Sequence, residues 1–230
     1  MESLKGQQII PESIGDKTYT VLKNLIIQSK LSPGMRLKEE VLSSMLELSR
    51  TPLREALKRL QDDGWVTRIP GGGVKVSDIS QKEVEELYQI REVLEGLMAR
   101  EATNLLKEDD LSRLEELIQK MEMAAALNDS QLVIDYGHKF HDIIYEKANN
   151  QKCLEILRNV LDHIERYRYL GVDTSPGRRK KAGDEHRQLL NALITGKGNK
   201  VEQVMREHIR YGGQAVLESI DKWLSKRSNG

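Results

Sequence analysis

The chain has 230 residues and a formal net charge of zero, with 38 % hydrophobic and 31 % charged residues. Phe occurs once and Trp twice, so the cores must consist mainly of aliphatic side chains, and the composition favours helices. A single cysteine, Cys153, excludes an internal disulfide framework, and no apolar run approaches the ~18 residues of a membrane span. Residues 1–10 lack the features of a secretion signal, so we expect a cytoplasmic protein without membrane contacts.

Residues 14–78 are predicted to form a winged helix-turn-helix. Three apolar stripes with helical spacing follow one another, and short breaks at 31–34 and 48–49 separate them. The stripes are Tyr19, Leu22, Leu25 and Ile26; Val41, Leu42, Met45 and Leu46; and Leu53, Ala56, Leu57 and Leu60. Two β-prone runs, 65–69 and 74–76, then flank a Gly-rich turn and predict a hairpin wing.

Residues 79–230 are predicted to form an all-α helical bundle, which makes the fold mainly α. Ser80 and Glu83 have the capping-box spacing at the start of the first helix. The predicted helices cover residues 80–106, 110–127, 130–148, 151–170, 183–195 and 199–225. The segment 171–183 contains Pro, Gly and four consecutive basic residues, so we expect it to be mobile, and we expect residues 1–13 to be loose.

The third predicted helix carries a basic stripe beside its apolar face. Arg50, Arg54 and Lys58 are spaced four residues apart, and Arg can bond O6 and N7 of guanine in the DNA major groove. Thr51 shares the first turn with Arg50, and a helix-turn-helix presents this end of its recognition helix to base edges. Ser49 can cap the helix, whose exposed N–H groups also favour a phosphate.

The distribution of charge and the wing also bear on DNA binding. Residues 16–77 contain 11 Lys/Arg and 7 Asp/Glu, whereas residues 78–230 contain 24 and 27, so only the N-terminal part suits a polyanion. Arg68 and Lys75 on the hairpin are either phosphate contacts or plain surface side chains. A basic stripe alone is usually a solvated helix face, and the preceding helix and following hairpin are what favour DNA.

Residues 31–37 read LSPGMRL, residues 48–57 read LSRTPLREAL, and Leu60 and Gly64 follow. In order and spacing this segment resembles the winged helix of the GntR family of bacterial transcription regulators. The resemblance implies operator contacts by Arg50, Thr51 and Arg54, and a wing tip around Gly71 that enters the minor groove. The chain departs from the family at Glu47, where the turn usually contains Gly, and we expect slight backbone strain there.

Three histidines lie on the apolar faces of three different predicted helices: His141, His186 and His208. A lone histidine on such a face is usually a core residue. Three buried imidazoles each need a polar partner, and one shared divalent metal ion (Zn, Ni or Mn) would satisfy all three. From the periodicity alone, a metal site and a metal-free polar core remain equally open.

The pattern Arg91-x-x-x-Glu95, Phe140-His141, Glu185-His186 and His208 resembles the FCD domain of one GntR branch, over about residues 80–220. The resemblance implies a divalent metal held by three histidines and one aspartate, with a carboxylate effector beside it. The three histidines named above match the family's positions.

The aspartate of that family lies one turn before the first histidine, where this chain has Gly137. His138 lies on the same face and is a candidate fourth ligand; water or the effector could also fill the position. Arg91 is a candidate to bind an effector carboxylate, because its guanidinium suits bidentate bonding. The alternative for Arg91 is a structural salt bridge with Glu95, one turn further along the helix.

The sequence therefore predicts a homodimeric, non-enzymatic regulator, most simply a repressor, that reads palindromic operator DNA and responds to an organic acid. Two alternatives compete with this interpretation. One is a metal-dependent hydrolase, in which three histidines and an open metal position activate water. The other is an architectural DNA-binding protein without a ligand.

Overall fold

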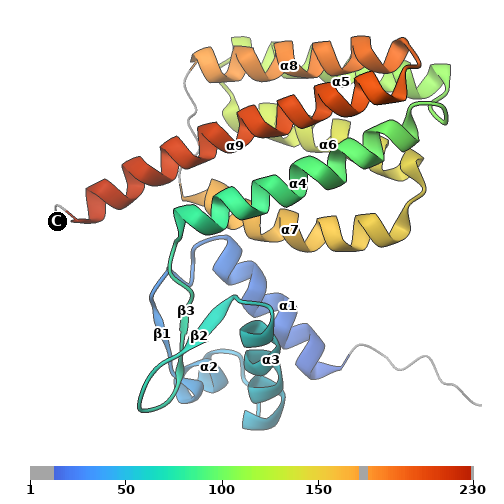
Figure 1. Cartoon of the computed structure of the whole chain (residues 1–230). Helices are drawn as coiled ribbons and strands as arrows, with labels where there is room; N and C mark the ends of the chain where they lie inside the picture. The colour runs from blue at the N-terminus through green and yellow to red at the C-terminus, as the bar shows by residue number, and fades with distance from the viewer. Residues whose placement is uncertain (1–12, 171–175, 229–230) are drawn as a thin grey trace, which may run out of the picture. The chain divides into compact units, whose positions relative to one another are not determined.

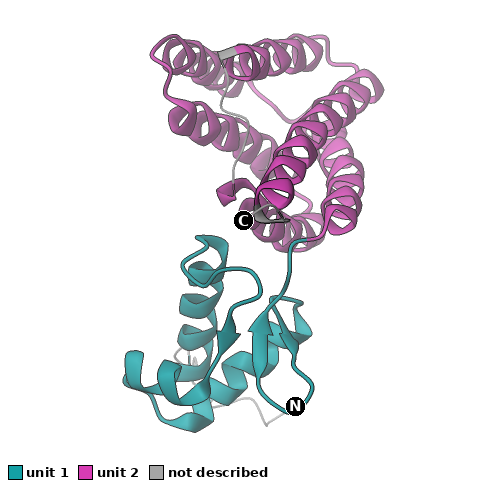
Figure 2. Cartoon of the chain, turned by 90° about the vertical axis from the view of Figure 1, so that its left-hand side faces the viewer, with its two compact units in different colours: residues 1–79 teal, residues 80–230 magenta. Residues whose placement is uncertain are grey.

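The computed structural model describes residues 13–170 and 176–228 (Figure 1). The chain divides into two compact units at the boundary between Ile79 and Ser80 (Figure 2). The described residues are mostly helical, with one small sheet in the first unit, which confirms the predicted mainly α fold class. No helix in the described ranges is both long and apolar enough to cross a membrane.

The first unit is a winged helix-turn-helix. Its elements are α1 (Ile14–Ile27), β1 (Arg36–Leu37), α2 (Glu39–Met45), α3 (Arg50–Asp62), β2 (Val66–Arg68) and β3 (Val74–Val76). The strands form an antiparallel sheet in the order β1-β3-β2. The hairpin of β2 and β3 was predicted, but β1 was not, because two residues are too few to show an alternating pattern.

The predicted apolar stripes of α1 and α3 form the core of this unit, but the stripe of α2 is wrong. In α2 only Leu42 is buried, whereas Val41 is 50 % exposed and Met45 is 70 % exposed. A helix of seven residues has about two turns, so its packing against α3 covers only a narrow stripe. Glu47, in the following turn, has φ of 52°, the left-handed conformation expected for a position where glycine is usual.

The N-terminus of α3 differs in one detail from the expectation. Ser49 is the N-cap and has extended backbone angles, but its side chain makes no capping hydrogen bond with the described residues. The first N–H groups of α3 therefore remain available to a ligand or to water. Pro52 is the third residue of the helix, where no intrahelical N–H bond is lost.

The second unit consists of helices only, within the described residues. They are α4 (Gln81–Ala102), α5 (Glu108–Ala126), α6 (Ser130–Ala148), α7 (Gln151–Tyr169), α8 (Pro176–Ile194) and α9 (Gly198–Ser228). α4 packs mainly along α9, and α5 packs against α6 and α8. Gly213 of α9 permits the first contact, because a Cβ there would lie 2.8 Å from the ring of Tyr88.

Helix α8 begins seven residues earlier than predicted, so a mobile segment reaching residue 183 is wrong. Proline suits the first turn of a helix, where its missing N–H needs no partner, and the Lys and Arg residues that follow are good helix formers. Residues 171–175 of the expected mobile segment lie outside the described residues, as does most of the predicted loose segment 1–13.

The capping box predicted at the start of α4 is only half formed. The Ser80 hydroxyl accepts a hydrogen bond from the Glu83 backbone N–H at 3.2 Å. The Glu83 carboxylate does not return the bond; it accepts a hydrogen bond from the Tyr167 hydroxyl at 2.5 Å. A tertiary contact to α7 thus replaces the local one.

Candidate DNA interface and metal centre

A basic hollow lies between helix α3 and the wing of the first unit. Its basic lining residues are Arg36, Lys38, Arg54, Lys58 and Arg68, and its acidic ones are Glu39 and Asp62. Three of these basic residues were predicted from the sequence. Arg36 and Lys38 were missed, because only the pairing of β1 with β3 brings them beside the recognition helix.

The wing tip, Gly71 to Gly73, closes one side of the hollow. These glycines have φ of 86°, 113° and 83°, which side chains rarely adopt, and a Cβ added to any of them would meet nothing within 4 Å. Backbone conformation therefore requires glycine here, and the tip stays slim. On the same hairpin, Arg68 Nε donates to Gln61 Oε1 at 3.2 Å, and Lys75 is paired with Asp78 at 2.5 Å.

The predicted base-reading side chains are exposed and only weakly held. Arg54 Nε lies 2.8 Å from Glu39 Oε2, and Arg50 lies 3.7 Å from Glu40, both in exposed pairs. Exposed ion pairs of this kind contribute about 0–1 kcal/mol, so a guanine edge or a phosphate can replace the carboxylate. Thr51 and Lys58 are exposed as well.

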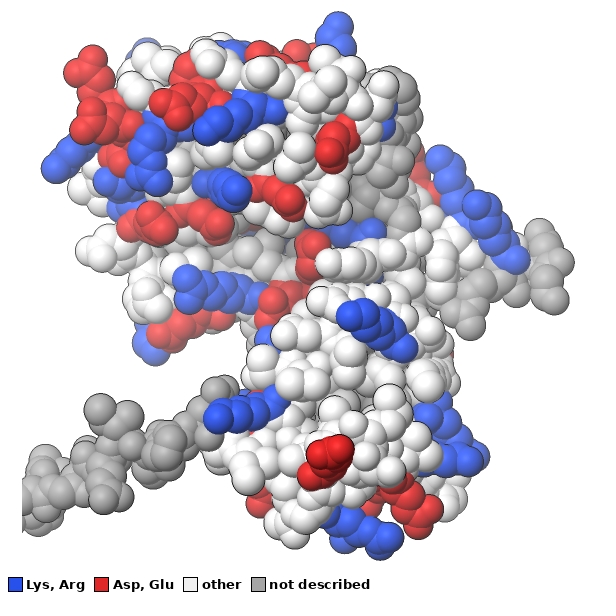
Figure 3. Space-filling view, turned by 180° about the vertical axis from the view of Figure 1, so that it is seen from behind, with Lys and Arg blue, Asp and Glu red and all other residues white. Residues whose placement is uncertain are grey.

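The helical unit exposes charged side chains of both signs. On the face seen in Figure 3, basic and acidic side chains are intermixed over the upper unit, without a large patch of one sign. Such a face does not create the strong positive field that attracts a DNA backbone. This mixed surface agrees with the near balance of 24 Lys/Arg and 27 Asp/Glu in residues 78–230.

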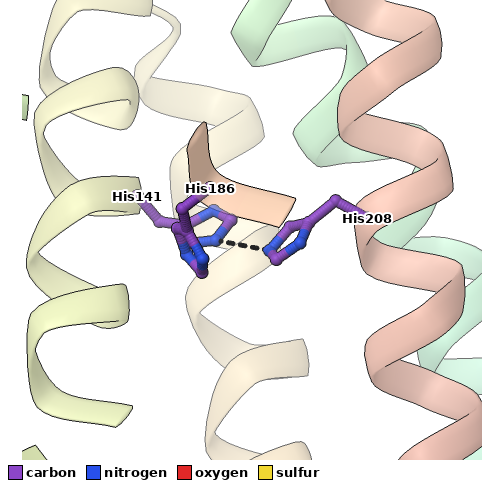
Figure 4. Close-up of side chains that lie close together, drawn as sticks. All are labelled: His141, His186 and His208. Atoms are coloured by element: carbon purple, nitrogen blue, oxygen red, sulfur yellow. Dashed lines mark hydrogen bonds between the residues drawn. The ribbon is translucent and has the colours of Figure 1, made fainter. Parts of the chain in front are cut away.

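The three predicted histidines meet inside the helical unit (Figure 4). His141 comes from α6, His186 from α8 and His208 from α9, and one ring nitrogen of each lies within 4.8 Å of the others. Their exposed fractions are 4 %, 5 % and 9 %. We call these three residues the histidine cluster.

Each imidazole of the histidine cluster uses Nδ1 for a contact that faces outward. Nδ1 of His141 lies 2.7 Å from Oε2 of Glu95 in an ion-pair contact that lacks hydrogen-bond geometry, and Nδ1 of His208 makes a hydrogen-bond contact of 3.1 Å with Oε2 of Glu185. Nδ1 of His186 lies 2.7 Å from the carbonyl oxygen of Ala182. Histidines that ligate metals usually donate their second ring N–H to a carboxylate or carbonyl in this way.

The three Nε2 atoms are left to face the centre of the cluster. Nε2 of His141 lies 3.1 Å from Nε2 of His208. Nε2 of His186 is buried and has no hydrogen-bond partner among the described residues. An orphaned buried nitrogen is costly, and a divalent ion bound by all three Nε2 atoms would satisfy it, so these residues fit a metal.

The protonation of the cluster also suits a metal. Burial lowers the pKa of His186 well below its ordinary value and also lowers the pKa of His208, which favours the neutral form that binds metals. Burial alone would raise the pKa of Glu95, but the charges of Arg91 and His141 lower it, so this carboxylate stays ionised beside the cluster.

Gly137, at the position of the family's aspartate, faces the cluster. A Cβ built there would lie 3.5 Å from Nε2 of His186, at ordinary van der Waals distance. His138, the candidate substitute ligand, is not part of the cluster, because its Nε2 contacts the guanidinium of Arg168. Burial and the charge of Arg168 lower the pKa of His138 to about 3.

A pocket lies against the histidine cluster, with lining residues from α4, α6, α7, α8 and α9. Arg91 lines this pocket and also forms the buried salt bridge with Glu95 that was its alternative role. Glu95 therefore joins Arg91 to His141. Glu185 makes a similar link between His208 and Arg178, which lies 3.4 Å from its Oε1. Helical periodicity did not predict this role of Glu185, although Glu185 precedes His186 in the quoted motif.

A winged helix with a basic hollow, attached to a helical unit with a pocket lined by histidine, arginine and apolar side chains, defines a ligand-regulated DNA-binding transcription regulator. The comparisons with known proteins agree. The chain belongs to the GntR family: the model "Bacterial regulatory proteins, gntR family" matches residues 15–76, and the model "FCD domain" matches residues 86–211.

Similar proteins of known name are regulators of transcription. The chain is 26 % identical to the HTH-type transcriptional repressor RspR of Escherichia coli over 95 % of this chain and 93 % of that protein. It is 28 % identical to the regulator YdhC of Bacillus subtilis over 89 % and 91 %. The solved structure of E. coli McbR/YncC has the same fold, with a TM-score of 0.71 and 24 % identity over 90 % of this chain and 99 % of that one.

Proposed function

We propose that this protein is a homodimeric repressor whose affinity for a palindromic operator is controlled by an organic acid bound beside a divalent metal ion. The observation that carries the proposal is the orientation of the histidine cluster: three Nδ1 atoms are engaged outside it, and three Nε2 atoms face its centre. The effector changes the affinity for DNA only as far as it prefers one arrangement of the protein.

His141, His186 and His208 would hold the ion, which is Zn, Ni or Mn given the imidazole ligands. With glycine at position 137, at least one coordination position is free of protein ligands. When bound, the ion supplies a Lewis acid to which a carboxylate can coordinate. Arg91 lines the same pocket and would pair with that carboxylate through the N–H groups that Glu95 does not use.

The DNA-reading surface comprises α3 and the wing. Arg50, Thr51, Arg54 and Lys58 would contact bases or phosphates in the major groove, and Ser49 would lie beside a phosphate at the helix N-terminus. Arg68 and the slim tip at Gly71 would enter the minor groove. Arg36 and Lys38 extend this surface along β1, where they suit the phosphate backbone.

A two-fold operator requires two copies of the chain. The helical unit exposes apolar side chains on the adjacent helices α4 and α7: Ile90 is 46 %, Val93 49 % and Ile156 57 % exposed. We propose that a second copy covers this face. Because the partner is DNA, the protein would act in the cytoplasm of a bacterial cell.

The hydrolase alternative is weaker than a regulatory role. A general base within reach of a metal-bound water would be needed, yet no Asp or Glu is among the described residues that line the pocket. Glu95 and Glu185 are occupied on the far sides of the imidazoles. We therefore propose that the pocket binds its ligand without turning it over.

Elemental analysis of the purified full chain, before and after dialysis against a chelator, tests the metal. About one ion per chain that is lost with the chelator supports the site. A folded, DNA-binding protein that never contains or takes up Zn, Ni or Mn would refute it. The effector would then be held by arginines alone.

A further inference from the structure

The pocket beside the histidine cluster contains a buried hydroxyl group without a hydrogen-bond partner. Tyr88 of α4 lines this pocket together with the histidines and Arg91. The residue is 5 % exposed, and its hydroxyl is buried and has no hydrogen-bond partner among the described residues. A buried polar group in this state destabilises the protein that carries it, and phenylalanine would fill the same space without that cost. The hydroxyl therefore calls for a reason other than stability.

A glycine in the middle of α9 makes room for the ring of Tyr88. A Cβ at position 213 would lie 2.8 Å from one ring carbon of Tyr88 and 2.9 Å from another, which is closer than van der Waals contact allows. Glycine weakens a helix interior, because it loses more backbone entropy on folding than any other residue. Two destabilising features, Gly213 and the buried hydroxyl, thus hold this one side chain in the wall of the pocket.

Tyr88 lies close to the residue that is proposed to bind the effector carboxylate. Arg91 follows Tyr88 by one turn of α4, and its guanidinium carbon lies 5.6 Å from the centroid of the Tyr88 ring. The Tyr88 hydroxyl is shielded from water, so a ligand reaches it through a rotation of a neighbouring side chain, a change that is common on binding. Since the hydroxyl has no water to lose, a hydrogen bond from it to a ligand carries no desolvation cost on the protein side.

We propose that the Tyr88 hydroxyl donates a hydrogen bond to the effector, and that the effector is an organic acid with a hydroxyl or carbonyl oxygen a few bonds from its carboxylate. This inference rests on the proposed carboxylate effector and narrows its chemical class. The single turn between Tyr88 and Arg91 limits this oxygen to the second, third or fourth carbon of the acid. A site built to hydrogen-bond a ligand oxygen rejects an analogue without it, because the protein group is then left unpaired.

Calorimetric titration of the purified full chain in the presence of Zn tests the inference with two series of acids. Butyrate and hexanoate are each compared with their hydroxy and oxo derivatives at the three carbons, all of which carry a single negative charge. In at least one series we expect an acid with the added oxygen to bind roughly tenfold more tightly than its parent, the scale of one hydrogen bond to a buried group. Equal affinities throughout both series overturn the inference. If no acid binds, the organic-acid proposal itself fails, and this inference fails with it.

Two tyrosine variants separate recognition of the ligand from a structural role. Tyr88→Phe should reduce the ratio of the two affinities to about one, and its Tm should equal or exceed that of the parent, because an unpaired hydroxyl is removed. Tyr167→Phe is the control, because the Tyr167 hydroxyl is bonded to Glu83 at 2.5 Å and does not line the pocket. It should retain the ratio and lower the Tm.

Three outcomes with these variants contradict the inference. A ratio that survives in Tyr88→Phe means that the metal or another group binds the added oxygen. A ratio that is lost equally in Tyr167→Phe indicates a general effect of removing a tyrosine hydroxyl. A Tm of Tyr88→Phe that falls as far as that of Tyr167→Phe means that the Tyr88 hydroxyl stabilises the protein by itself.

Discussion

Replacing Gly137 with Asp should turn the three-histidine cluster into a four-ligand site. A Cβ at this position is 3.5 Å from Nε2 of His186, so an aspartate carboxylate can reach an ion at the centre without moving backbone. An added anionic ligand should strengthen metal binding by about 10–100-fold, on the scale of ligand-shell changes in other metal sites. We expect the measured Kd to fall by that factor in competition with a chromogenic chelator.

The same substitution should have opposite effects on stability with and without metal. Removing glycine from a helix interior stabilises it by about 0.5–1 kcal/mol. Without metal, however, the added carboxylate is buried with no ion to bind, and an unsatisfied buried polar group costs about 1–3 kcal/mol or more. The free energy of unfolding should therefore decrease in chelator and increase in saturating metal.

Gly137→Ala is the matched control, because it changes helix propensity without adding a ligand. It should stabilise the protein by about 0.5–1 kcal/mol in both conditions, since its Cβ makes only ordinary contacts. If Gly137→Asp binds metal no better than Gly137→Ala, position 137 does not face the ion, and the proposed coordination centre is misplaced.

Four other predictions concern DNA, metal, assembly and pH. Arg54→Ala should cost about 1–3 kcal/mol of specific operator binding in a gel-shift series, and unchanged affinity would exclude a base contact. His186→Ala should abolish metal retention without impairing DNA binding by the winged helix; equal metal content in variant and parent would end the three-histidine proposal. Ile156→Asp should shift the chain towards monomers in analytical ultracentrifugation and weaken operator binding, and an unchanged dimer would place the interface elsewhere. His138 should stay neutral in NMR titrations down to about pH 3, because burial and Arg168 lower its pKa. In the unfolded chain His138 binds a proton near pH 6.5, whereas in the folded chain it stays neutral. The free energy of unfolding should therefore decrease as the pH falls below 6.5. A His138 signal titrating near pH 6.5 would contradict this account.

Matched controls make these measurements specific. Arg113→Ala on α5 removes an arginine of similar exposure from the helical unit and should not affect operator binding. Ile194→Asp changes a residue that is 61 % exposed, against 57 % for Ile156, and that belongs to α8, which packs against α5, α6 and α9. A similar loss in a control and its partner would indicate a general effect of the substitution.

The sequence predicted the parts of the fold in which periodicity and burial coincide. The stripe of α3 is fully confirmed, because Leu53, Ala56, Leu57 and Leu60 form the centre of the first core. The apolar residues of α2 misled the prediction, since a short helix cannot cover both Val41 and Met45. The start of α8 was predicted too late because Pro and Gly were interpreted as signs of a loop, although proline is also a normal first residue of a helix.

In the candidate site, too, periodicity predicted which side chains point inward but not which ones pair. Helical spacing predicted that His141, His186 and His208 point inward, and the structure brings them together. Periodicity does not reveal which side chains from other helices engage each Nδ1 atom. Glu185 lies on the same helix as His186 but contacts His208. This pairing depends on how α8 and α9 pack.

If the pocket binds both a metal ion and an acid, Glu95 and Glu185 determine how the two ligands influence each other. Each carboxylate joins one arginine of the pocket to one imidazole of the cluster. An anion that draws Arg91 or Arg178 towards itself leaves the carboxylate more strongly engaged with its histidine, whose Nε2 becomes a better donor to a metal. The proposed metal and effector would then be thermodynamically linked: the factor by which the acid strengthens metal binding would equal the factor by which the metal strengthens binding of the acid. In a cell short of the metal, the protein would bind the acid more weakly and would respond as if less acid were present.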